Sequence, residues 1–217
     1  MKALSRRSIL LLPLSAWASS HFWDKDDPYT WTADEITQLT TKSPWAKEAT
    51  AELKSNDSNM AGAAPRAAGR GRRGGGSAGA ASPGLPKFQS IVRWASAKPI
   101  REALKLKFPE SLAGHYVISV SGLPIISPGD TGDRADDDSF ATIKDQTALL
   151  LKRGEPIQPG VAYQDPNDTS TIYFGFLPQL ANVADAKTAI FTMSTGPLEV
   201  KVKFNLEEMK YRGELAV

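Results

Sequence analysis

The C-terminal part of the chain has the most regular pattern of apolar and polar positions. From residue 198 to residue 204 every second side chain is apolar, and those between are charged. This alternation is typical of a strand with one buried face. It resumes over residues 209–217, and residues 188–194 form a third apolar segment that ends at a Thr-Gly-Pro turn. The three segments predict a C-terminal antiparallel meander.

Four earlier segments also have the composition of strands. Residues 88–94 and 115–122 alternate between apolar and polar side chains, and residues 157–163 and 169–176 flank an Asp-Pro-Asn-Asp turn signal. The last two segments therefore predict a hairpin.

Two helices are predicted among these strands. Lys98 and Pro99 open the first, whose inward side chains are Ile100, Ala103 and Leu104. Ser139 is a suitable N-cap for the second, which is closed by Lys152, Arg153 and Gly154. The apolar stripe of the second helix consists of Phe140, Ile143, Thr147, Leu150 and Leu151.

The N-terminal region predicts a helical hairpin. Thr32 and Glu35 have the spacing of a capping box, in which each side chain bonds the other residue's backbone amide. Ser43 and Pro44 are suited to begin a second helix. Its apolar face is formed by Trp45, Ala49 and Leu53, at i, i+4 and i+8.

These elements predict an α+β fold: a mainly antiparallel sheet with two helices packed on it, an N-terminal helical hairpin and a disordered linker. The predicted organisation is a signal peptide at 1–18, a helical segment at 19–54, a linker at 55–86 and an α+β domain at 87–217. The linker is rich in Gly, Ala, Ser, Pro and Arg, and buries too little apolar surface to offset its ordering entropy.

The first 18 residues resemble an export signal. Lys2, Arg6 and Arg7 precede a short apolar run, and small residues at Ala16 and Ala18 favour cleavage after Ala18. The run is shorter than the about 20 residues that span a bilayer as a helix, so no transmembrane segment is expected after cleavage. The paired arginines leave two routes open, ordinary secretion and twin-arginine export. Either route places the protein in the periplasm or outside the cell.

Composition narrows the possible chemistry. The chain has no cysteine, which excludes disulfides, thiolate metal sites and cysteine nucleophiles. Three of its 26 basic residues and none of its 24 acidic residues lie in the leader, so the rest carries a net charge of −1. This balance argues against a broad basic face, and no specific nucleic-acid partner is expected.

A histidine and two serines share one face of the strand at 115–122. His115, Ser119 and Ser121 are the types that form a nucleophile and its base. Residues i and i+4 on a strand are about 13 Å apart, however, which is too far for proton transfer. We therefore expect no serine hydrolase and name no catalytic residue.

Two charged segments are candidate binding sites. Clustered carboxylates suit calcium, but their spacing differs from the known calcium loop, and a role in keeping a loop soluble beside a helix N-terminus is the simpler interpretation. The aspartates are Asp130, Asp133, Asp136, Asp137 and Asp138.

The second candidate is the linker, whose flexible arginines suit a polyanion. The arginines are Arg66, Arg70, Arg72 and Arg73.

Several motifs in order resemble an uncharacterised family of exported soil-bacterial proteins. They are W-T-A-D-E-I-T-Q-L with S-P-W-A-K, the Arg/Gly insert, V-R-W-A-S-A-K-P-I-R-E-A-L, Y-V-I-S-V-S-G-L-P and G-P-L-E-V-K-V-K-F-N-L. The resemblance implies an exported single-domain protein and supplies no activity, cofactor or site.

The sequence therefore predicts an exported, non-catalytic protein that binds an unidentified protein or polymer of the envelope or the extracellular space. Two alternatives stay open. One is a calcium-dependent binding module or hydrolase that uses residues 130–138, and the other is polyanion contact through the arginine tract.

Overall fold

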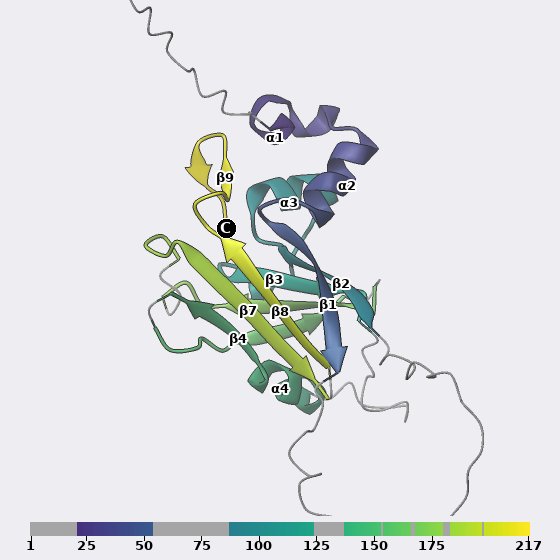
Figure 1. Ribbon diagram of the computed structural model, residues 1–217, viewed down its shortest axis with the longest axis vertical. Helices are drawn as coiled ribbons and strands as arrows, with labels where there is room; N and C mark the ends of the chain where they lie inside the picture. Colours follow the sequence, from purple (N-terminus) through teal and green to yellow (C-terminus); the bar gives the residue numbers. More distant parts are fainter. Residues whose placement is uncertain are drawn as a thin grey trace, which may run out of the picture.

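The computed structural model describes residues 21–53, 87–123, 137–152, 154–165, 168–179, 183–196 and 198–217, with backbone alone for residues 52, 53 and 137–140. Eight strands form one antiparallel sheet in the order β4-β7-β8-β1-β2-β3-β6-β5 (Figure 1). The strands are β1 Ala46–Leu53, β2 Phe88–Trp94, β3 Tyr116–Ser121, β4 Thr147–Leu151, β5 Val161–Gln164, β6 Thr171–Phe176, β7 Thr188–Thr195 and β8 Leu198–Asn205. The helices are α1 Phe22–Lys25, η1 Pro28–Thr30, α2 Ala33–Thr41, α3 Lys98–Leu104, η2 Glu110–Leu112 and α4 Asp137–Asp145. This arrangement confirms the predicted α+β class.

The sheet is curled, so that its two halves face each other across one core. The rings of Phe174 in β6 and Phe191 in β7 have centroids 5.8 Å apart, although four strands separate β6 from β7 in the sheet. Trp94 in β2 meets Phe204 in β8 edge to face at 5.5 Å. All four side chains are fully buried. Burial of each aromatic side chain contributes roughly 1.5–3 kcal/mol, so these two ring contacts stabilise the curled sheet.

The two edges of the sheet, β4 and β5, are brought together by the chain between them. Leu149 and Ile157 exchange two backbone hydrogen bonds of 2.8 and 2.9 Å, which ties β4 to the segment that leads into β5. Helix α4 packs against β4, β5 and β7. Each edge is therefore partly covered, which limits pairing with other chains.

The predicted helix at residues 43–53 is wrong, because the chain forms β1 there. Strand β1 pairs with β2 along most of its length and with β8 at its end. A Trp-Ala-Leu spacing of four residues suits a helix, but it also suits one face of a strand, on which every second residue points the same way. Pairing on both sides decides the outcome over local propensity. Residues 46–53 therefore belong to the main sheet, and α2 is followed by a strand in place of the predicted second helix of a hairpin.

The second predicted helix is half right. Helix α4 ends at Asp145, and residues 147–151 form β4, which pairs with β7. Thr147 closes the helix by donating its hydroxyl to the carbonyl of Ile143 at 2.7 Å. The run Thr-Ala-Leu-Leu-Leu pairs with β7 along its whole length, so the sheet again overrides a helical pattern.

The third strand of the predicted meander is also wrong. Strands β7 and β8 pair as expected, but residues 209–217 form a separate small hairpin of β9 Lys210–Tyr211 and β10 Glu214–Leu215. Its turn places Arg212 at φ 52° and Gly213 at φ 88°, the pair of positive angles of a tight hairpin turn. This turn aims the chain end away from β8.

The C-terminal hairpin is attached to the N-terminal helices. The amide of Arg212 donates to Asp24 Oδ1 at 2.9 Å, and Trp45 Nε1 donates to the carbonyl of Ala216 at 2.7 Å. Tyr211 donates its hydroxyl to Glu102 of α3 at 2.8 Å. The two ends of the described chain therefore stabilise one another.

Helix α2 and helix α3 form as predicted, with one change. The Thr32 and Glu35 capping box is present. Leu104 was expected to face inward but is 39% exposed, since α3 ends there and Lys105 adopts a left-handed conformation. Helix α3 packs mainly against α2 and η1 at one end of the sheet (Figure 1).

The predicted leader at 1–18 and linker at 55–86 lie outside the described residues. Among the helices that are described, none has the length and apolar character needed to span a membrane.

Candidate functional site

The charged segments singled out in the sequence fall largely outside the described residues. This applies to the arginine tract and to Asp130, Asp133 and Asp136. Asp137 and Asp138 begin α4, where the backbone alone is described. Within the described ranges, no three His, Asp or Glu side chains are grouped to hold a metal ion. The calcium and polyanion hypotheses therefore stay predictions.

The polar side chains of residues 115, 119 and 121 do not bond to one another. His115 Nδ1 lies 3.1 Å from the carbonyl oxygen of Ala113. Ser121 accepts from Arg93 Nη1 at 2.8 Å. Ser119 lies between them along the strand, and no hydrogen bond of the described residues joins either serine to His115. The three side chains do not form a nucleophile and base.

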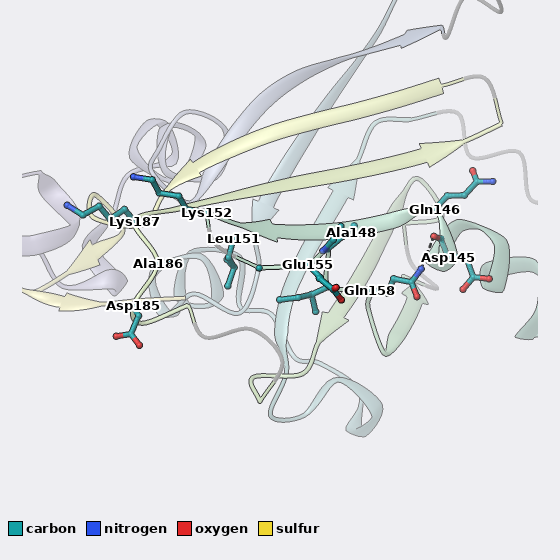
Figure 2. A pocket seen from close by; sticks show the side chains of 13 residues that line it. Asp145, Gln146, Ala148, Leu151, Lys152, Glu155, Gln158, Asp185, Ala186 and Lys187 are labelled. Atoms are coloured by element: carbon teal, nitrogen blue, oxygen red, sulfur yellow. Dashed lines mark hydrogen bonds between the residues drawn. The ribbon is translucent and has the colours of Figure 1, made fainter. Parts of the chain in front are cut away.

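A large open groove runs beside β4. Its volume is about 1480 Å³. Three segments line it: the end of α4 with β4, the loop that returns to Ile157, and the residues before β7 (Figure 2). The lining residues are Asp145, Gln146, Ala148, Leu151, Lys152, Gly154, Glu155, Pro156, Ile157, Gln158, Asp185, Ala186 and Lys187.

The shape of the groove follows from local backbone bonding. The Leu149–Ile157 bridge holds the returning loop against β4. Gln158 donates its side-chain amide to the carbonyl of Asp145 at 3.3 Å, which fixes the loop to the C-terminal end of α4. On the far side, the amide of Ala186 donates to Val183 at 3.2 Å and forms a turn. Three segments distant in sequence thus enclose one surface.

Charge is distributed along the groove. Lys152, Lys187 and Asp185 lie at one end, Asp145 lies at the other, and Glu155 lies between them (Figure 2). Lys187 forms an ion pair with Glu207 at 2.9 Å, and this hydrogen bond raises the pKa of Lys187 and lowers that of Glu207. Because both side chains are more than half exposed, the pair contributes little to stability.

The described lining of the groove combines apolar, amide and charged side chains. Among the described residues that line it, none has an imidazole, thiol or hydroxyl side chain. Apolar side chains come from β4, the loop and the segment before β7. They are Ala148, Leu151, Pro156, Ile157 and Ala186. An apolar floor between charged ends suits a chain-like ligand with side chains of both signs.

A second feature is a row of polar side chains on the outer face of β2, β3, β6 and β5. Arg93 stands opposite Ser119, Ser119 opposite Tyr173, and Tyr173 opposite Tyr163. Burial lowers the pKa of Arg93, although a guanidinium stays charged at neutral pH. Burial, followed by the Asp165 carboxylate, raises the pKa of Tyr173 to about 12, so its hydroxyl stays protonated.

Sequence reasoning missed both features. The groove joins residues around 150 with residues around 186, and the row depends on the pairing of four strands. The density of Gly, Pro and charged residues from 152 to 158 was the one local signal for the groove. The sequence places Ser119 on the polar face of its strand, but it does not indicate that Arg93 and Tyr173 lie beside it.

Comparison of the chain with models of protein families, with curated proteins and with solved structures finds no match, so the geometry of these two features carries the functional argument.

Proposed function

We propose that this protein is an exported, non-catalytic binding protein that holds an extended peptide segment of an envelope or extracellular partner in the groove beside β4. The observation that carries this proposal is the groove itself, with its volume of about 1480 Å³, its open form and its apolar side chains between charged ends.

The size of the groove favours a chain-like ligand. Pockets for small molecules and cofactors typically measure about 300–1,000 Å³ and enclose most of the ligand. A larger, open groove exposes one side of its occupant to solvent. An extended peptide satisfies this geometry, because alternate side chains point into the groove and away from it.

The charges of the groove define the preferred peptide. Lys152 favours an acidic side chain at the end that Lys187 and Asp185 also line, and Asp145 and Glu155 favour basic side chains. Such charges contribute to orientation and to the rate of association more than to affinity. The apolar floor around Leu151 and Ile157 supplies the remaining contact area.

Site-specific crosslinking tests the proposal. A photoreactive phenylalanine analogue replaces the exposed lining residue Gln146 in the full chain, and the adduct formed in cells is digested to identify the crosslinked partner segment. That segment is then made as a synthetic peptide, and its binding is measured by calorimetry. We expect saturable binding that Ala148→Trp abolishes, since a large ring at the half-buried Ala148 fills the groove.

Lys201→Trp is the matched control, because Lys201 is exposed on β8 and does not line the groove. It is expected to bind the peptide as the unmodified protein does. Equal binding by all three proteins would refute the groove as the site.

Export rests on Lys2, Arg6, Arg7 and the small residues before the expected cleavage after Ala18. Cell fractionation with mass measurement of the exported form tests it. A form that retains residues 1–18 in the cytoplasm would contradict export.

Thermal unfolding of the same protein with calcium and then with chelator tests the aspartate alternative. Salt-dependent binding that is lost on deletion of residues 66–73 would support the polyanion alternative.

A further inference from the structure

The polar row on the outer face of the sheet brings together four side chains from four different strands. Residues directly opposite on neighbouring antiparallel strands have Cβ atoms about 4.5–5.5 Å apart. The register Arg93, Ser119, Tyr173 and Tyr163 therefore sets one cation and three hydroxyls in a line.

Arg93 is a half-buried cation bonded to neutral acceptors. Its Nε donates to the carbonyl of Thr40 at 2.7 Å, and its Nη1 donates to Ser121 Oγ at 2.8 Å. In the described part of the chain it makes no ion pair with a carboxylate. A guanidinium has five N–H donors, so most of its capacity is unused. The Asp168 carboxylate attracts Arg93 electrostatically without forming an ion pair with it, so the unused N–H donors are open to an oxyanion that bonds the guanidinium directly.

Ser119 adds a second donor next to Arg93. The residue is 3% exposed, and its hydroxyl has no hydrogen-bond partner among the described residues. The hydroxyl keeps contact with solvent, because only Trp31 Nε1 and Trp94 Nε1 are fully buried without a partner among the described residues, and it is therefore open to a ligand. It lies where it would bond the same oxyanion as Arg93.

Carboxylates and aromatic rings border the row at its β5–β6 end. Tyr173 donates its hydroxyl to Asp165 Oδ2 at 3.4 Å, and Asp168 accepts from Ser170 and Thr171 at 2.6 Å each. The ring of Phe108 packs against that of Tyr173 at 5.9 Å. These carboxylates disfavour a bare anion, but they accept hydrogen bonds from hydroxyl groups beside an anion. Aromatic faces suit the carbon skeleton of such a molecule.

We propose that this row is a binding site for a small hydroxy acid of the sugar-acid type, distinct from the groove beside β4. The carboxylate of the ligand binds Arg93 and Ser119. Its hydroxyls donate toward Asp165 and Asp168, and its carbon skeleton lies against Phe108.

Nuclear magnetic resonance titration of the full chain with sodium D-glucuronate tests the site. D-glucose is the matched probe, because it has the same ring without the carboxylate. Glucuronate is expected to produce saturable shifts in the Arg93 Nε–H signal and in the amide signals of Ser119 and Tyr173. Glucose is expected to produce none at Arg93.

Two serine variants separate binding from folding. Ser119→Ala removes a hydroxyl with no protein partner, so we expect an unchanged unfolding temperature and roughly tenfold weaker glucuronate binding. Ser90→Ala is the control. Ser90 is buried in the neighbouring β2 and donates to Ala49 at 3.1 Å, so this variant is expected to lose stability and keep its affinity.

Arg93→Lys keeps the positive charge but loses the planar guanidinium, which can donate two parallel hydrogen bonds. This variant is expected to weaken glucuronate binding more than Ser119→Ala does. Three results would overturn the proposal: shifts that grow linearly with salt without saturating, equal shifts with glucose, or unchanged affinity in Ser119→Ala.

Discussion

Two buried tryptophans differ in whether the indole nitrogen has a hydrogen-bond partner, and this difference allows a quantitative test of the structure. Trp45 and Trp94 are both fully buried. Trp45 Nε1 donates to the Ala216 carbonyl at 2.7 Å, whereas Trp94 Nε1 has no hydrogen-bond partner among the described residues. Replacement of each by phenylalanine removes a similar volume and one N–H group.

The two substitutions should have unequal effects on the free energy of unfolding. Both lose apolar contact and leave a small cavity, at a cost of roughly 1–2 kcal/mol each. Trp45→Phe also loses a hydrogen bond and leaves the Ala216 carbonyl unpaired, which costs about 1–2 kcal/mol more. Trp94→Phe instead removes an unpaired buried donor and regains about 1–2 kcal/mol. We therefore expect Trp45→Phe to be the more destabilising by roughly 2–4 kcal/mol.

Urea unfolding followed by circular dichroism measures both effects, provided that the denaturant slope stays constant across the variants. Deletion of Ala216 and Val217 removes the acceptor, so it should be strongly non-additive with Trp45→Phe and additive with Trp94→Phe. If Trp94→Phe costs as much as Trp45→Phe, the assigned environments of the two indole nitrogens are wrong.

Three further predictions concern backbone strain, ionisation and helix capping. Gly122 and Gly213 have φ of 84° and 88°, but a Cβ at Gly122 would lie 2.8 Å from a backbone oxygen of β2, whereas one at Gly213 meets nothing within 4 Å. Gly213→Ala should therefore cost about 1 kcal/mol in urea unfolding and Gly122→Ala clearly more, and equal costs would contradict the close approach. Tyr173 and Tyr211 have pKa values raised from 10.0 to about 12, chiefly by burial. Between these values the unfolded chain has lost both protons and the native protein keeps them, so the free energy of unfolding should fall as the pH rises through this window. Tyr173→Phe should reduce that fall, and an unchanged dependence would show that Tyr173 titrates normally. Thr32→Ala removes the N-cap of α2 and should cost about 1 kcal/mol in the same unfolding assay, while Thr32→Ser should cost little; equal losses would show that the cap is not the cause.

Local signals in the sequence were sufficient for several elements. The alternation at residues 198–204 specified β8, because one face of the strand is buried in the core and the other faces solvent. The Thr32 and Glu35 pair specified the start of α2, since a capping box is completed within four residues. The Asp-Pro-Asn-Asp turn specified the β5–β6 hairpin. Each of these depends on contacts between residues close in the chain.

Elements stabilised by distant partners were not predictable in this way. Residues 46–53 and 147–151 have patterns that also suit helices, and they become strands because β2, β8 and β7 pair with them. The C-terminal segment has a strand pattern but turns away at Arg212 and Gly213 and binds the N-terminal helices. In each case a long-range contact outweighs a weak local preference.

The amino-acid sequence by itself determined the α+β class, the predominance of antiparallel strands and the apolar faces of the core strands, because these follow from short-range periodicity. The tertiary structure alone decided the strand order, the curl of the sheet, the groove beside β4 and the row that joins Arg93 to Ser119 and Tyr173. A strand pattern gives the face on which a side chain lies but not its neighbour on the next strand, and that neighbour is fixed by register. The polar row is built from such neighbours, and the groove from segments that the curled sheet brings together.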